Sequence, residues 1–278
     1  MLSYQHRYHA GNFADVHKHL VLTLALQGLA RKPAPFSVID THAGEGLYDL
    51  ASKEAARHQE FRDGIEKVLA VPAPPPAIRP YLDQVRAANP AGGLCFYPGS
   101  PDLALAFCRS DDDVVLVEMH PQALSELENR YARERRVHIH RRDGFEALAA
   151  LVPPRTRRGV ALIDPAYEQK SDYEAVVRAI ERAHARWSTG LYLVWYPLLP
   201  AGRHDALFAG LKATGIRKIM RSEWLHRPPA EDRGLYGSGI LAINPLWKMD
   251  EAIREAGAWM EQIEFGTGPA TLGWLVPE

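Results

Sequence analysis

Short apolar runs recur along the chain, and the segments between them carry apolar residues three and four positions apart. Runs of about four to eight apolar residues are typical of buried strands, whereas the wider spacing is typical of amphipathic helices. Seven such runs predict strands at residues 36–40, 114–118, 137–140, 159–163, 190–196, 216–224 and 239–244. Strands that alternate with helices favour an α/β fold, in which a mostly parallel sheet has helices on both faces.

The helical spacing is clearest in residues 121–133 and 173–187. A further helix is predicted at 12–29, before the first strand, because the apolar spacing follows Asn12, a residue that favours the N-cap position. The last two predicted strands are joined by a loop at 227–238. They suit an antiparallel pair at the edge of the sheet.

One segment interrupts the alternation of strands and helices. About seventy residues separate the first two predicted strands, which is too many for a single crossover helix. This segment contains charged helical stretches and a run rich in proline, with Pro72, Pro74, Pro75, Pro76 and Pro80. We therefore expect a small helical insertion at 51–96, and a main domain formed by 1–50 and 97–278.

Composition narrows the class of protein only slightly. The chain has 278 residues and a formal net charge of −1, whereas nucleic-acid-binding domains are often strongly basic. Arginines nevertheless gather locally, and they form either a solvated face or a phosphate-binding patch. These arginines are Arg130, Arg133, Arg135, Arg136, Arg141 and Arg142, followed by Arg155, Arg157 and Arg158.

Cellular location is predicted from what the sequence lacks. The two cysteines have no metal-type spacing and suggest a reducing compartment. The first residues lack the apolar core of a signal peptide, and no apolar run approaches the ~18 residues of a membrane span. We therefore expect a cytoplasmic protein with no membrane partner.

Candidate chemistry is clearest directly after the apolar run at 159–163, where Asp164, Pro165, Ala166 and Tyr167 follow one another. Pro165 prevents a simple continuation of the strand, and ligand sites of open α/β sheets lie at the carboxyl ends of strands. These four residues resemble the Asp-Pro-Pro-Tyr motif of methyltransferases that modify the exocyclic amine of adenine or cytosine. In that motif the acid and the proline carbonyl accept the amino hydrogens, and the aromatic ring stacks on the base. Ala166 stands where the motif has its second proline.

The end of the first predicted strand suggests a cofactor loop. Asp40 is followed by Gly44 and Gly46, and glycines let a backbone turn tightly and approach a ligand. A dinucleotide-binding motif would require a third glycine where Asp49 stands. The pattern instead resembles the first motif of class I methyltransferases, which bind S-adenosylmethionine.

Two further strand ends carry suitable residues. Glu118 ends the second predicted strand, where an acid accepts hydrogen bonds from ribose hydroxyls; the alternative is a surface carboxylate. Asp143 and Gly144 follow the third strand, where such methyltransferases contact the adenine amine of the cofactor. Four strand ends with this chemistry in this order indicate a cofactor site more strongly than any one of them.

The histidines do not predict a metal site. His17 and His19 lie two positions apart on the predicted helix and therefore face different directions. His138 and His140 share one face of a strand, but no carboxylate-rich motif accompanies them.

The chain resembles the RlmJ family of large-subunit (23S) ribosomal RNA adenine-N6 methyltransferases over nearly its whole length. The matching residues are Leu2 to Tyr4, His9 to Asn12, Asp15, Lys18, His19, Asp40 to Gly44, Tyr97 to Pro101, Asp143 to Phe145, the Asp164 motif, Trp195 to Pro197, Ala213 to Lys218 and Trp274 to Glu278.

The resemblance implies a class I, Rossmann-like fold with a mostly parallel seven-stranded sheet and S-adenosylmethionine as cofactor. It also implies N6-methylation of one adenine in 23S ribosomal RNA, before subunit assembly is complete. Catalysis would involve Asp164, Pro165 and Tyr167, and Tyr4 would lie over the active site and meet the RNA. The residues implied to contact the cofactor are Lys18, His19, His42, Ser100, Glu118, Asp143, Gly144 and Asp164.

Two other functions remain open at this level. A DNA adenine-N6 methyltransferase would use the same motif, so only the family resemblance favours RNA. A non-catalytic RNA-binding relative would be expected to have lost the acid of the motif, yet Asp164 is present. An α/β protein with an unrelated small ligand does not explain why Tyr4, Asp164 and Tyr167 occur together.

Overall fold

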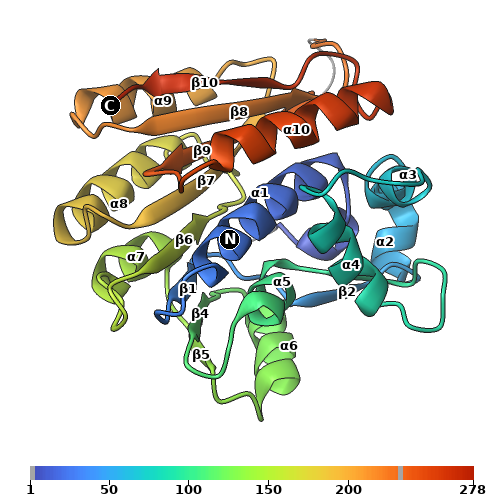
Figure 1. The fold of residues 1–278 in the computed structure, drawn as a ribbon, viewed down its shortest axis with the longest axis horizontal. Helices are drawn as coiled ribbons and strands as arrows, with labels where there is room; N and C mark the ends of the chain where they lie inside the picture. Colours follow the sequence, from blue (N-terminus) through green and yellow to red (C-terminus); the bar gives the residue numbers. More distant parts are fainter. Residues whose placement is uncertain (1–3, 231–233) are drawn as a thin grey trace.

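The computed structural model describes residues 4–230 and 234–278, and its main feature is a twisted sheet of eight strands in the order β10-β8-β9-β7-β6-β1-β4-β5 (Figure 1). Strands β1, β4, β5, β6 and β7 pair in parallel, whereas β9 and β10 pair antiparallel to their neighbours. The strands are β1 (Ser37–Asp40), β4 (Asp113–Val117), β5 (Val137–His140), β6 (Gly159–Ile163), β7 (Leu191–Leu198), β8 (Ile219–Leu225), β9 (Gly237–Ile243) and β10 (Thr271–Val276).

All seven predicted strands are present, so the predicted α/β class is confirmed. The predicted number of strands was wrong because β10 forms the edge of the sheet beside β8. Its residues are mostly exposed or half-buried, so the segment lacks the apolar run that identifies a buried strand. Strands β8 and β9 are antiparallel as predicted, but they lie inside this edge. Of the predicted features, Leu2, Ser3 and the part of the loop at 231–233 lie outside the described residues.

Helices cover both faces of the sheet and divide the core into two clusters. On one face lie α1 (Phe13–Ala30), α4 (Arg79–Ala87), α5 (Ser100–Phe107), α6 (Pro121–Tyr131) and α10 (Met249–Gln262). On the other face lie α7 (Gly144–Leu151), α8 (Asp172–Arg186) and α9 (His204–Ala213) (Figure 1). This arrangement lets strands that are buried on both sides consist almost entirely of apolar residues.

Helix α1 crosses the molecule beside the sheet and is buried on nearly every side. Asn12 caps its start as predicted, because the Asn12 side chain accepts a hydrogen bond from the Asp15 amide at 2.9 Å. Several buried positions of α1 are polar or charged, including Asp15, His17, Lys18 and His19. Buried polar groups require partners, so these four residues indicate where α1 contacts polar groups of a site or of the sheet.

The segment predicted to be an insertion leaves and rejoins the main domain at one place. Strands β2 (Leu47–Asp49) and β3 (Phe96–Pro98) pair antiparallel, and the Leu50 amide donates to the Cys95 carbonyl at 2.8 Å. Between them lie α2 (Lys53–His58), the 3-10 turn η2 (Glu60–Arg62), α3 (Ile65–Leu69) and α4. Buried residues of α3 and α4 join the same core cluster as α1. The boundaries 51–96 remain a prediction.

The order of the strands defines where a ligand can bind. From β1 the chain moves outward through β4 and β5, and then returns to place β6 on the other side of β1. Ligands of open α/β sheets bind beyond the carboxyl ends of the strands where the order reverses in this way. The ends of β1 and β6 should therefore border the site. No helix within the described residues is long and apolar enough to cross a bilayer.

Candidate active site

A cavity of about 780 Å³ lies at the carboxyl ends of β1, β4, β6 and β7. Every residue that the sequence analysis assigned to the site lines this cavity. They are Tyr4, Lys18, His19, His42, Ser100, Glu118, Asp143, Gly144, Asp164, Pro165 and Tyr167.

Two glycines allow the loops at the strand ends to approach each other. Gly44 has a φ of +67°, and a Cβ built on it would lie 2.2 Å from the Tyr48 hydroxyl oxygen. A Cβ on Gly144 would lie 2.2 Å from the Thr41 carbonyl oxygen and 2.8 Å from the His42 ring. Any side chain at Gly144 would therefore push apart the loops that follow β1 and β5.

Glu118 is fixed by the backbone around it. Its Oε2 accepts a hydrogen bond from the Gly44 amide at 2.9 Å, and its Oε1 accepts from the Met119 and His120 amides at 2.8 and 2.7 Å. Hydrogen bonds from three amides hold the carboxylate at the edge of the cavity, so Glu118 is more than an unconstrained surface acid.

Two histidines border the cavity and differ in their partners. The His42 ring bonds to the Thr41 hydroxyl at 2.8 Å, and burial lowers the pKa of His42 to about 4. His19 bonds to the Tyr97 hydroxyl at 2.7 Å, and burial also lowers the pKa of His19. Both rings are therefore neutral at pH 7 and can accept or donate one hydrogen bond without adding charge.

Asp40 ends β1 and is only 1% exposed. Burial raises the pKa of Asp40 to about 6, although hydrogen bonds from Ser100 and from the His42 amide favour the ionised form. The Lys18 cation contributes the smallest of these effects. Asp40 is thus a buried carboxyl without a bonded cation among the described residues.

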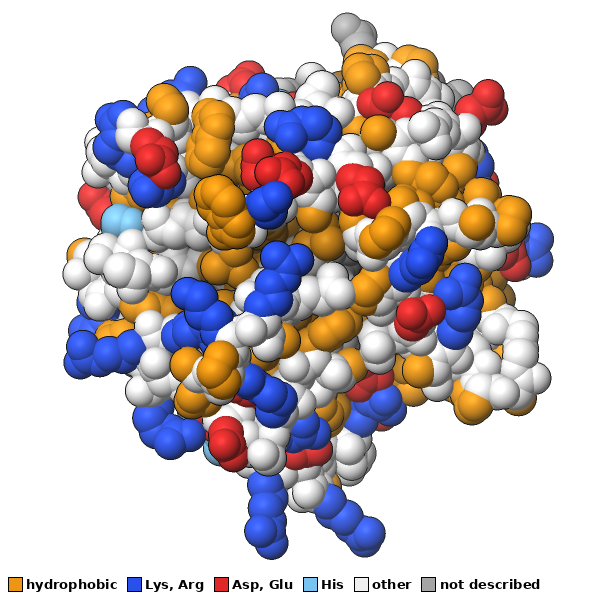
Figure 2. All heavy atoms as spheres, in the orientation of Figure 1, with side chains coloured by type: hydrophobic (Ala, Val, Ile, Leu, Met, Phe, Trp, Pro, Cys, Tyr) orange, Lys and Arg blue, Asp and Glu red, His pale blue; other side chains and the backbone are white. Residues whose placement is uncertain are grey.

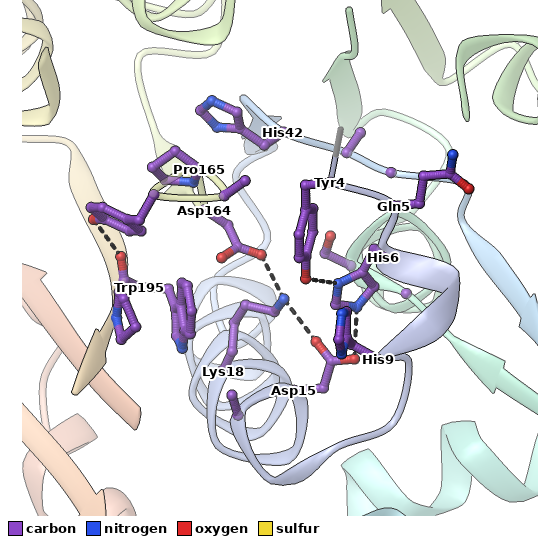
Figure 3. Close-up of a pocket in the computed structure, with 18 of the residues that line it drawn as sticks. Tyr4, Gln5, His6, His9, Asp15, Lys18, His42, Asp164, Pro165 and Trp195 are labelled. Atoms are coloured by element: carbon purple, nitrogen blue, oxygen red, sulfur yellow. Dashed lines mark hydrogen bonds and ion pairs between the residues drawn. The ribbon is translucent and has the colours of Figure 1, made fainter. Parts of the chain in front are cut away.

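A chain of ion pairs and hydrogen bonds joins Asp164 to Tyr4 (Figure 3). Lys18 Nζ bonds to Asp164 Oδ2 at 2.5 Å and to Asp15 Oδ1 at 2.8 Å. Asp15 Oδ2 bonds to His6 Nε2 at 2.8 Å, and His6 Nδ1 bonds to the Tyr4 hydroxyl at 2.8 Å. The short 3-10 turn η1 (His6–Tyr8) thereby brings Tyr4 and His6 into the site.

Lys18 and Asp15 hold each other in the charged state. Burial lowers the pKa of Lys18, but the Asp15 and Asp164 carboxylates outweigh it and raise that pKa well above its usual value. Burial raises the pKa of Asp15, but His6 and Lys18 outweigh it and lower that pKa well below its usual value. With Lys18 charged beside it, one oxygen of Asp164 is occupied. No described residue bonds to the other oxygen.

Tyr167 lines the cavity with little exposed surface. Its side chain is 5% exposed, its ring centre lies 4.5 Å from that of Tyr173, and its hydroxyl donates to the Trp195 carbonyl at 2.7 Å. Trp195 is half-buried and lines the same cavity from within β7. Tyr167, in the loop after β6, and Trp195, on the neighbouring strand, therefore both contribute aromatic surface to this part of the cavity.

The arginines do not form one patch beside the cavity. Arg142 lines the cavity with Arg141 next to it, whereas Arg135 precedes β5, at the opposite end of that strand. On the face drawn in Figure 2, lysine and arginine side chains are spread among acidic and apolar ones. Four of the nine arginines bond to other residues: Arg130 to Asp102, Arg136 to Glu134, Arg155 to Asp113 and Arg158 to Ala34.

Three residues that line the cavity were given no role from the sequence: His6, Asp15 and Trp195. Asp15 and Lys18 are three positions apart, a spacing that places both on one side of a helix, so the pair could have been predicted. The contacts of His6 and Trp195 depend on tertiary packing. Within the described residues, no group of three or more His, Cys, Asp or Glu side chains could hold a metal ion.

A mostly parallel sheet with an acid at the end of each of four neighbouring strands, and a glycine-containing loop after the first, defines a class I methyltransferase whose cofactor is S-adenosylmethionine. The profile of the family described as "Ribosomal RNA large subunit methyltransferase D, RlmJ" matches residues 33–276. The chain belongs to this family.

Individual relatives agree over the full length. Two proteins named "Ribosomal RNA large subunit methyltransferase J", from Escherichia coli K12 and Haemophilus influenzae, are each 40% identical to the chain, with complete coverage of both sequences. A crystal structure of a Legionella pneumophila protein is 33% identical, with a TM-score of 0.84, and covers 96% of this chain and 97% of that one.

Proposed function

We propose that this protein transfers the methyl group of S-adenosylmethionine to the N6 amine of an adenine in large-subunit (23S) ribosomal RNA. The observation that carries the proposal is the position of Asp164. Its carboxylate ends β6 inside the cavity, with one oxygen bonded to Lys18 and the other free of described partners. The Pro165 carbonyl follows directly and also has no described hydrogen-bond partner, so two acceptors adjoin the same space.

The surrounding residues fit the cofactor. S-adenosylmethionine, when bound, supplies the methyl group as part of a sulfonium cation. Glu118 is held by three amides and can accept hydrogen bonds from ribose hydroxyls, and Asp143 can accept one from the adenine amine. The missing side chain of Gly144 lets its loop lie directly against Thr41 and His42 at the edge of the cavity. We assign Lys18, His19, Ser100 and Asp164 to the same cofactor region.

Asp164 and the Pro165 carbonyl would prepare the amine for reaction. The lone pair of an adenine amine is delocalised into the ring, which makes the nitrogen a poor nucleophile. Hydrogen bonds from the two amino hydrogens to these acceptors favour a pyramidal nitrogen whose lone pair is available. As the new carbon–nitrogen bond forms, the bond between the methyl carbon and the sulfonium sulfur would break and leave a neutral thioether, and one amino proton would leave to Asp164 or to water. Such proton acceptance typically contributes about 10²–10⁴-fold in rate.

The charges around Asp164 support this role. Lys18 forms ion pairs with both Asp164 and Asp15, so the formal charges of the three groups sum to −1. A fixed negative charge beside the cavity favours both a bound cation and the positive charge that develops on the amine. Lys18 is therefore assigned to hold Asp164 ready as an acceptor.

RNA is favoured over DNA by the names of the full-length relatives. Tyr4 is 40% exposed at the mouth of the cavity, where it can meet RNA, and the exposed Arg141 and Arg142 can contact phosphates there. The target base must leave its helix, and RNA is read most readily where bases are unpaired. We therefore propose that the substrate is RNA that is not yet fully assembled into the subunit. A cytoplasmic location is proposed with it.

Asp164→Ala should abolish methyl incorporation into a large-subunit ribosomal RNA fragment, measured at saturating cofactor, while the protein stays folded. Asp164→Asn is more discriminating, because its amide oxygen still accepts a hydrogen bond but is a far weaker base. Partial activity of Asp164→Asn would assign most of the effect to orientation, and its absence would assign it to charge or proton acceptance.

The matched control is Asp111→Ala, which removes an exposed acid from a loop before β4 and should leave incorporation unchanged. Near-normal incorporation by Asp164→Ala would end the assignment of this cavity as an amino-methyltransferase site. Mass mapping of the methylated adenines, with and without the protein, identifies the modified position.

A further inference from the structure

Asp164 directly follows β6, and Trp195 lies at the same level within the neighbouring parallel strand β7. Val194 of β7 pairs with Ile163 of β6, so the next residue on each strand is Trp195 or Asp164. Adjacent strands lie about 4.8 Å apart. Both side chains lie on the α1 side of the sheet, because Asp164 bonds to Lys18 while the Trp195 indole bonds to Ser238, itself a partner of His17 (Figure 3).

A base bonded to Asp164 would therefore lie beside the indole. Tyr167 is less suited to this contact, because it is 5% exposed and belongs to the core cluster on the α8 side of the sheet. Its ring packs on Tyr173 and its hydroxyl is bonded to the Trp195 carbonyl. These contacts fix the loop after β6 against β7 and leave Trp195 as the more accessible aromatic ring.

A buried neutral network fixes the orientation of the indole. Trp195 Nε1 donates to Ser238 Oγ at 3.0 Å, and Ser238 Oγ also bonds to His17 Nδ1 at 3.0 Å. His17 Nε2 bonds to Ser222 Oγ at 3.0 Å, and the His17 ring stacks on Trp224 at 4.2 Å. An indole can only donate. If Ser238 passes its own hydrogen to His17, and His17 passes one to Ser222, every group in the network is satisfied.

We propose that the Trp195 indole is the surface on which the target adenine stacks, held at its angle by Ser238 and His17. This inference rests on the proposed function, and it moves the main stacking contact from Tyr167 to a residue outside the Asp164 motif. Tyr167 acts instead through its hydrogen bond, which holds the backbone of Trp195 in place.

Fluorescence of 2-aminopurine tests the stacking directly. The probe is a large-subunit ribosomal RNA fragment whose mapped target adenine is replaced by 2-aminopurine. This base lacks the 6-amine and so cannot make the hydrogen bonds to Asp164, which separates stacking from amine recognition. Stacking on an aromatic ring quenches its emission. The complex with Trp195→Leu should be brighter than the wild-type complex, whereas Trp195→Phe should stay quenched.

Activity should follow the same order. Loss of base–aromatic stacking lowers an equilibrium constant or a rate constant by roughly 5- to 150-fold. Trp195→Leu is expected to lower kcat/KM for the unmodified RNA by this factor, and Trp195→Phe by much less. Trp247→Leu is the matched control, because Trp247 is 83% exposed and lies outside the cavity, and it should change neither measurement.

Unchanged quenching in Trp195→Leu, with quenching lost in Tyr167→Leu, would overturn the proposal and return the contact to Tyr167. Thermal unfolding of each variant shows whether it is folded, and Tyr167→Leu, which should stay quenched, still tests the proposal if Trp195→Leu is not folded. Wild-type protein that methylates no RNA would contradict the proposed function itself, which is a different outcome.

Ser238 acts through the indole N–H, and a double-mutant cycle tests this role. Ser238→Ala should raise KM for RNA in the wild type and have no further effect in the Trp195→Phe background, where no N–H exists to orient. An equal effect of Ser238→Ala in both backgrounds would mean that Ser238 serves only the packing of β9.

Discussion

Two consecutive residues of α1 enter networks of opposite character. Lys18 faces the cavity and is charged between two carboxylates, whereas His17 faces the sheet and is neutral between two serine hydroxyls. Successive helical residues point about 100° apart, so one helix can supply both networks. Burial lowers the pKa of His17 to about 3, while carboxylates keep Lys18 charged at equal depth.

The charged network of Lys18 and the neutral network of His17 differ in what the loss of one partner would cost. A buried charge depends on every one of its partners, because losing one leaves an uncompensated charge in a medium of low dielectric constant. A neutral hydrogen bond contributes only about 1 kcal/mol, and its loss is tolerated more easily. The charged network reaches Asp164, which we propose to bind the substrate amine, and the neutral network reaches the Trp195 ring beside it. The interactions whose loss would cost the most free energy thus lie beside Asp164, where we propose that charge develops during the reaction.

The largest expected effect is the removal of Asp15 from the charged network. Asp15→Ala would leave Lys18, His6 and the Gly11 amide without their shared acceptor, and breaking a buried ion pair typically costs about 3–5 kcal/mol. Urea unfolding should show this loss in the free energy of unfolding. The surface pair of Asp83 and Arg86 provides the control, since Asp83→Ala should cost no more than about 1 kcal/mol. Equal losses in both variants would mean that burial does not strengthen the Asp15 network.

Asp40 is a third case, a buried acid without a bonded cation, and it predicts a pH dependence of stability. The pKa of Asp40 is raised to about 6 in the folded protein, against about 3.9 in the unfolded chain. The folded protein therefore holds the extra proton between about pH 4 and pH 6, and its stability falls as the pH rises through this window. Relative to Asp40→Asn, the wild type should lose about 3 kcal/mol across it.

Chemical unfolding at pH 4 and pH 7 checks this prediction. Asp15, whose pKa is lowered, titrates in the opposite sense, but it is present in both proteins and cancels in the comparison. A constant difference between wild type and Asp40→Asn over the whole range would show that Asp40 ionises normally.

The sequence predicted most of the parallel sheet because its strands are buried on both faces and read as apolar runs. The eleven site residues named from the sequence, partly from strand ends and partly from the family resemblance, all lie among the residues that line the cavity. Strand β10 was missed because an exposed edge strand needs no apolar run. The paired strands β2 and β3 have three residues each, which is too short for a periodic pattern.

The networks of α1 were less predictable for a different reason. A helix buried on nearly all sides has no single apolar face, so its sequence does not tell which polar residue meets which partner. The partners of His17 lie 205 and 221 positions away in the chain. Contacts of that separation are decided by the pairing of β7, β8 and β9, and a single sequence does not give their register.

Glu118 extends the comparison to a carboxylate held only by backbone amides. Glu118→Ala should weaken S-adenosylmethionine binding by roughly 1.5–3 kcal/mol, the range for a hydrogen bond to a charged group. Calorimetry measures the affinity, with Glu128→Ala on the exposed side of α6 as the control. Unchanged affinity in a folded Glu118→Ala protein would remove Glu118 from the cofactor site.

Ser222 gives the smallest expected effect and the sharpest contrast with Asp15. Ser222→Ala removes one neutral partner of His17, so the free energy of unfolding should fall by about 1 kcal/mol. Because His17 is neutral at every pH well above 3, this loss should be the same at pH 5 and pH 8. Cofactor affinity should not change, since Ser222 does not line the cavity. Urea unfolding at the two pH values measures both points, and a loss that grows at pH 5 would mean that His17 takes up a proton. In that case the network beside Trp195 would also carry charge, and the two networks of α1 would differ only in how much charge they hold.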